Sequence, residues 1–234
     1  MAINLGGMTT VMLPGTGSDD DYITRAFSKP LGDAGAQVLA PQPQPNHLID
    51  SYLIALDDAA RRGPIAVGGV SIGAAVAVAW ALQHPDRALA VLAALPAWTG
   101  PPDDAPAAIA ARHSAQQLRH HGLAATTAQM RASSPPWLAD ELTRSWRGQW
   151  PHLPDAMEEA ATYVAPTRAQ LQQLAAPMGV VAAADDPVHP LAIGVEWATA
   201  APHAALGTVT LDQMGADPAA LGAACLAALE AAGA

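Results

Sequence analysis

Short apolar runs alternate with helical stretches along this chain of 234 residues, and the alternation restricts the possible folds more than any other property. The runs predict strands at residues 9–13, 37–40, 65–70, 88–95, 178–184 and 206–211. Helices are predicted at residues 47–62, 72–84, 191–201 and 218–232. Strands that are apolar throughout must be covered on both faces. We therefore expect an α/β protein with a mostly parallel, doubly wound sheet of about six strands.

One long segment, residues 98–176, interrupts this alternation. It contains no convincing strand, only helical pieces punctuated by glycine and proline. A helical insertion between two strands of such a sheet usually covers the face where ligands bind. We therefore predict a core formed by residues 1–97 and 177–234, with a helical lid at 98–176.

The sharpest motif is the G-x-S-x-G sequence from Gly69 to Gly73, with Ser71 at its centre. It follows one predicted strand and opens a predicted helix, which is the context that a nucleophile elbow requires. Such a strand-to-helix turn presents the serine hydroxyl at the edge of the sheet, next to the positive end of the helix dipole. An incidental serine in a glycine-rich turn is the alternative interpretation.

With this motif in place, the chain resembles the α/β-hydrolase family over nearly its whole length. The sequence Leu13-Pro14-Gly15-Thr16-Gly17 follows the first strand, where the family carries its oxyanion loop. The resemblance implies that the backbone N–H groups of Thr16 and Ile72 form the oxyanion hole. It also implies that Asp186, in the sequence Asp185-Asp186-Pro187 after a strand, is the acid that orients a catalytic histidine, with Asp185 as the less favoured candidate.

The family's histidine follows the last strand, and the resemblance places Ala216 at that position. An alanine cannot accept the serine proton, so the triad is incomplete at its usual place. Either the histidine was replaced, or the natural chain lacks it, or another histidine does the work. His189, three residues after Asp186, is the best substitute base. Weaker alternatives are Asp217 and three histidines of the predicted lid, His113, His120 and His121.

The resemblance implies a serine hydrolase that acts on a small ester, thioester or related acyl substrate. Ser71, Asp186 and His189 would be catalytic, and Gly15, Trp98 and Trp137 are candidates for substrate contact. Two other classes stay open, namely a non-catalytic relative that binds a ligand or partner, and a non-hydrolytic enzyme of the same fold, such as a lyase.

Composition argues against several other functions. The chain has 21 acidic and 11 basic residues, a net charge of −10, and no basic stripe for nucleic acid. Gly15-x-Gly17 lacks the third glycine of a dinucleotide fingerprint, and the acidic residues lack metal-site spacing, so we expect no cofactor and no metal. The run Asp19-Asp20-Asp21 is interpreted as a helix start capped by Ser18 or Asp19. Without a signal peptide or a membrane-length apolar run, a cytoplasmic location is expected, while the oligomeric state stays open.

Overall fold

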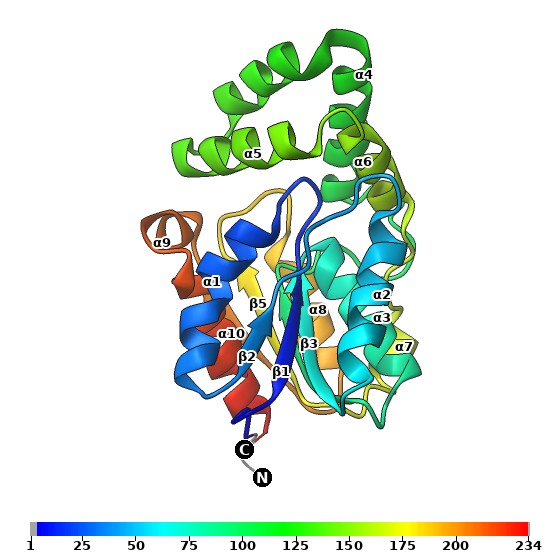
Figure 1. The fold of residues 1–234 in the computed structure, drawn as a ribbon, viewed down its shortest axis with the longest axis vertical. Coiled ribbons are helices and arrows are strands. Elements are labelled where there is room, and N and C mark those ends of the chain that lie inside the picture. Colours follow the sequence, from blue (N-terminus) through cyan, green and yellow to red (C-terminus); the bar gives the residue numbers. More distant parts are fainter. Residues whose placement is uncertain (1–3, 234) are drawn as a thin grey trace.

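A six-stranded sheet, parallel throughout, forms the centre of the computed structural model, which describes residues 4–233 (Figure 1). The strand order is β2-β1-β3-β4-β5-β6. The strands are β1 (Thr9–Leu13), β2 (Gln37–Leu39), β3 (Ile65–Val70), β4 (Ala88–Ala94), β5 (Met178–Ala183) and β6 (Ala204–Val209). The predicted α/β class and parallel sheet are therefore confirmed.

Helices cover both faces of the sheet, as the apolar strands require (Figure 1). On one face lie α1 (Asp20–Asp33) and α10 (Ala219–Ala232), which share a hydrophobic cluster that contains Phe27 and Leu229. The other face is covered by α2 (Leu48–Ala60), α3 (Ile72–Gln83) and α8 (Leu191–Ala200). These three helices pack around a second cluster that includes Tyr52, Trp80 and Trp197.

Four helices connect β4 to β5: α4 (Pro106–Ser133), α5 (Pro136–Gln149), α6 (Leu153–Thr162) and α7 (Arg168–Leu171). The first three lie beyond the carboxyl ends of the strands (Figure 1). Gly122, with a φ of 74°, divides α4 into two helical arms. By contrast, α7 packs beside α8, and Leu171 belongs to the core cluster on that face. The part of segment 98–176 that lies over the strand ends is thus α4–α6.

The carboxyl-terminal region differs from the sequence prediction. The last strand runs from Ala204 to Val209 instead of 206–211, and a short helix that was not predicted, α9 (Leu211–Ala216), follows it. Thr210 and Gln213 form a capping box, so the chain turns into a helix where the strand was expected to continue. At the other end, Asp19 caps α1 by accepting a hydrogen bond from the backbone N–H of Tyr22, as expected. Within residues 4–233, no helix combines the length and apolar character needed to cross a membrane.

Candidate active site

Ser71 occupies a sharp turn between β3 and α3, with a φ of 56° and a ψ of −115°. Residues other than glycine rarely adopt this backbone conformation. Such backbone strain is typical of functional sites. The neighbouring chain leaves no room for a larger residue at Gly73, because an added Cβ would collide with the carbonyl oxygen of Leu13. The G-x-S-x-G sequence therefore allows the end of β1 to lie directly against the turn that carries Ser71.

An imidazole and a carboxylate extend from Ser71 in a continuous series of hydrogen bonds. Nε2 of His189 lies 3.0 Å from Oγ of Ser71, and Nδ1 of His189 lies 2.7 Å from Oδ2 of Asp186. Oδ1 of Asp186 accepts a hydrogen bond of 2.8 Å from the backbone N–H of Val188. The acid and the imidazole come from one loop after β5, whereas the serine comes from the turn after β3.

The electrostatics of this loop favour an ionised Asp186. Burial raises the pKa of its carboxyl, but the hydrogen bond and charge of His189 and the N–H groups of Val188 and His189 outweigh burial, and the pKa is lowered overall. An ionised carboxylate can only accept hydrogen bonds, so the proton between the two side chains belongs to Nδ1 of His189. When the ring carries only this proton, its Nε2 is an acceptor for the hydroxyl of Ser71.

The residues predicted for the oxyanion hole flank this serine. Ile72 is the first residue of α3, where helix N–H groups have no acceptor within the helix. Thr16 lies in the loop after β1, and both Gly15 and Thr16 line the same cavity as Ser71. The loop after β1 and the turn that carries Ser71 therefore border one cavity.

A cavity of about 380 Å³ opens onto Ser71, His189 and Asp186. Its walls include Trp98 and Trp137, the two tryptophans predicted to contact substrate. The other large side chains that line it are mainly apolar: Leu95, Met130, Leu138, Leu142, Trp146, Met157, Leu211 and Met214. Tyr22 also lines the cavity, and burial together with Glu141 raises its pKa to about 12, so its hydroxyl stays protonated at neutral pH.

The alternative bases lie elsewhere. Among the described residues, His189 is the histidine that lines the cavity, whereas His113, His120 and His121 are exposed on α4. Ala216 is an exposed residue at the end of α9. The carboxylate of Asp217 accepts the backbone N–H of Ala219 at the start of α10.

Asp185, the less favoured acid, accepts a hydrogen bond from the backbone N–H of Leu211 and so ties the β5 loop to α9. Among residues 4–233, no group of three or more His, Cys, Asp or Glu side chains is arranged to hold a metal ion.

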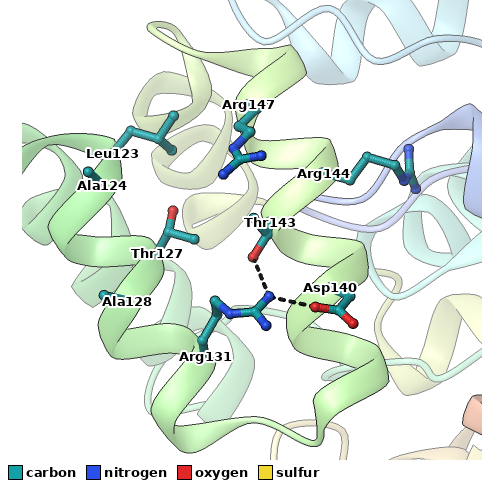
Figure 2. Close-up of a pocket in the computed structure, with 9 residues that line it drawn as sticks. All are labelled: Leu123, Ala124, Thr127, Ala128, Arg131, Asp140, Thr143, Arg144 and Arg147. Atoms are coloured by element: carbon teal, nitrogen blue, oxygen red, sulfur yellow. Dashed lines mark hydrogen bonds and ion pairs between the residues drawn. The ribbon is translucent and has the colours of Figure 1, made fainter.

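A second hollow, of about 800 Å³, separates the outer arm of α4 from α5 (Figure 2). Its lining consists of Leu123, Ala124, Thr127, Ala128, Arg131, Asp140, Thr143, Arg144 and Arg147. Across it, Arg131 donates hydrogen bonds to Asp140 and Thr143 (Figure 2). Ser71, His189 and Asp186 are absent from this lining, so the serine, imidazole and carboxylate open into the smaller cavity and not into this one.

Three residues around the loop after β1 were missed by sequence reasoning. The hydroxyl of Tyr52 donates to the carbonyl oxygen of Pro14 at 3.1 Å. From α5, Ser145 donates to the carbonyl oxygen of Gly17, and Gln149 donates to that of Ser18 at 2.9 Å. No motif marks these residues, because each reaches a segment distant in sequence.

Solved structures share this architecture at low sequence identity. An enol-lactonase from Burkholderia xenovorans superposes with a TM-score of 0.66 and 18% identity, over 90% of this chain and 85% of that one. MenH from S. aureus gives 0.75 and 13%, over 98% and 96%. A thermophilic esterase from Thermogutta terrifontis gives 0.65 and 17%, over 88% and 82%. No protein-family model and no curated protein matches the chain. The chain has the α/β-hydrolase fold, as its motifs predicted.

Proposed function

We propose that this protein is a serine hydrolase that acts on a small ester, thioester or related acyl substrate. The observation that carries the proposal is the series of hydrogen bonds from Ser71 through His189 to Asp186 at the floor of a cavity. A hydroxyl is a poor nucleophile at neutral pH unless an adjacent base removes its proton. His189 has the position and the free Nε2 lone pair for that task.

In the proposed reaction, Oγ of Ser71 attacks the substrate carbonyl while Nε2 of His189 takes the hydroxyl proton. Asp186 holds the ring in the required tautomer and stabilises the imidazolium that forms. The N–H groups of Thr16 and Ile72 would stabilise the oxyanion of the tetrahedral intermediate. The imidazolium then protonates the leaving group, and a water molecule, activated by the same ring, releases the acyl group from Ser71.

His189 would therefore replace the histidine that is missing at Ala216. Its distance from Ser71 and its contact with Asp186 support this assignment, as does the exposed position of Ala216. On this proposal the triad is complete, and the base comes from the loop that also supplies the acid.

The cavity supports a substrate with a modest apolar acyl group. Its volume of about 380 Å³ is near the lower end for small-molecule sites, and its large side chains are mainly apolar. Helices α4–α6 would act as the lid, with Trp98 and Trp137 as walls against the acyl chain. Two of the solved structures with this fold are named as an esterase and an enol-lactonase, and both names denote enzymes that act on ester bonds.

Hydrolysis of p-nitrophenyl butyrate by the wild-type protein and by a Ser71→Ala variant tests the proposal. We expect turnover that falls at least about 10³-fold in the variant, as for removal of a triad serine. A fluorophosphonate should label the wild-type protein at Ser71 and leave the variant unlabelled. A folded wild-type protein that neither hydrolyses the ester nor reacts with the fluorophosphonate would instead support the non-catalytic interpretation.

A further inference from the structure

Helix α5 holds the loop that carries Thr16 through a row of polar contacts. Ser145 donates to the carbonyl oxygen of Gly17, and Gln149 Nε2 donates to the carbonyl oxygen of Ser18 at 2.9 Å. Beside them, Arg144 forms an ion pair with Asp19. Three consecutive residues of the loop are therefore bonded to one face of α5, more than 120 residues later in the chain.

The side chains of Ser145 and Gln149 are buried, and burying a polar side chain costs more free energy than burying an apolar one. Ser145 is 3% exposed and Gln149 is 8% exposed. A buried polar group destabilises the fold unless it is hydrogen-bonded, and an apolar side chain would fill the same space at lower cost. Gln149 even leaves its amide oxygen without a partner among the described residues, while its N–H group bonds to the loop. The donors thus serve the loop rather than the packing of α5.

The loop itself is shaped for close contact with α5. Gly17 has a φ of 71°, and a Cβ added there would lie 2.7 Å from the indole Nε1 of Trp146. On its other side, the hydroxyl of Tyr52 holds the carbonyl oxygen of Pro14 at 3.1 Å. Hydrogen bonds therefore hold the backbone on both sides of Thr16. A residue of α2 binds the carbonyl of Pro14, and a residue of α5 binds the carbonyl of Gly17.

We propose that Ser145 and Gln149 are positioning residues for the oxyanion hole. By holding the carbonyl groups of Gly17 and Ser18, they aim the N–H of Thr16 at the oxygen that becomes negative during acyl transfer. This inference rests on the proposed hydrolase function. It makes α5 part of the machinery for transition-state stabilisation, although α5 supplies no reacting group.

The test compares Ser145→Ala and Gln149→Met with the wild-type protein. Loss of an oxyanion-hole donor lowers kcat by about 10²- to 10³-fold, so a misaligned donor should cost about 10-fold in each variant. KM should stay within about twofold, because the bond to Thr16 strengthens only in the transition state. The affinity for an alkyl boronic acid, which forms a tetrahedral adduct with the serine, should fall by the same factor as kcat. Ser145→Thr keeps the hydroxyl and should retain most of the activity.

Two variants on the opposite side of the same helix serve as matched controls. Thr143 and Arg147 face the outer hollow between α4 and α5 (Figure 2). Thr143→Ala and Arg147→Ala should leave kcat and the boronic acid affinity unchanged. Thermal unfolding of each variant checks that the fold persists. If Ser145→Ala does not fold, Gln149→Met carries the test by itself.

Folded Ser145→Ala and Gln149→Met variants with wild-type kcat and boronic acid affinity would overturn the inference while leaving the hydrolase proposal intact. An increase in KM with unchanged kcat would also overturn it, because α5 would then only shape the binding cavity. A wild-type protein without ester turnover and without fluorophosphonate labelling would refute the proposed function, and this inference with it.

Discussion

At the scale of single residues, the proposed acid and base, Asp186 and His189, lie within four consecutive positions of the chain. Asp186 closes the turn through the N–H of Val188 with one carboxylate oxygen and faces His189 with the other. The hydrogen bonds between the acid and the proposed base are therefore local, and Asp185 ties the same loop to α9, where the family's histidine would lie. A single side chain, His189, then links this loop to Ser71.

Replacement of His189 by alanine tests its role as base. General-base catalysis by a positioned side chain contributes about 10²- to 10⁴-fold, so kcat should fall within that range while the unfolding temperature changes little. The matched control is His121→Ala, an exposed histidine of α4 that should keep wild-type activity. Full activity in a folded His189→Ala variant would contradict the assignment.

The lowered pKa of the Asp186 carboxyl predicts how the stability of the fold depends on pH. Its pKa is lower in the folded protein than in the unfolded chain, so its ionised form stabilises the fold above about pH 4, the usual pKa of an aspartate. This contribution is lost as the pH falls through the folded-state pKa. Denaturant unfolding of wild type and Asp186→Asn should therefore show a stability difference at pH 6 that shrinks toward about pH 3. A difference that stays constant over this range would exclude the linkage.

At the scale of elements, a side chain of α6 supplies the cap that α2 lacks. His47, the residue before α2, makes no side-chain cap, and the carboxylate of Glu159 instead accepts the N–H groups of Leu48 and Ile49 at 2.8 and 3.2 Å. A negative charge at this end also complements the helix dipole. One carboxylate thereby fastens a helix over the strand ends to a helix of the core.

Removal of this cap should destabilise the protein measurably. We expect Glu159→Ala to lower the free energy of unfolding by about 1–2 kcal/mol, as for loss of other helix caps. The adjacent Glu158→Ala is a matched control, because Glu158 forms only a surface ion pair with Arg119, worth about 0–1 kcal/mol. Equal losses in the two variants, measured by urea denaturation, would show that Glu159 does not act as a cap.

The same scale shows how far the sequence predicts this fold. All six residues of β3 are buried, and the continuous apolar run made that strand easy to recognise. By contrast, β6 is an edge strand with mixed exposure, so its pattern is weak and its bounds were misplaced by two residues. The short α9 went unpredicted, although the T-x-x-Q spacing of its capping box, from Thr210 to Gln213, was a readable signal.

Some residues of the candidate site could be predicted from the sequence and others could not. The motif around Ser71 and the D-x-x-H spacing of Asp186 and His189 are local, so sequence reasoning could single out these residues. Ser145 and Gln149 act across more than 120 positions of the chain, and no local pattern encodes such contacts. Long-range polar contacts between a helix and a loop become visible only when the fold brings the segments together.

At the scale of the whole molecule, burial is distributed unevenly between the core and the helices above it. Nearly all of α3 is buried between β3, β4 and α2, whereas α5 buries only Ala139, Ser145, Trp146 and Gln149. Local opening costs least where few apolar contacts are lost. The helices over the strand ends should therefore open at lower free energy than the sheet and its flanking helices.

Native-state hydrogen exchange can measure this difference. We expect amides of α5 and of the outer arm of α4 to exchange before those of β3 and α3, whose exchange should require global unfolding. Covalent reaction of Ser71 with a phosphonate should then slow exchange in α5 more than in α10. The reason is that α5 lines the cavity and is bonded to the loop of Thr16, whereas α10 packs on α1 and the sheet and does not line the cavity. The Ser71→Ala protein treated with the same reagent is the control and should show no change. Equal protection of α5 and α3 in the free protein would mean that the whole molecule opens as one unit, with no separate motion of the helices above the site.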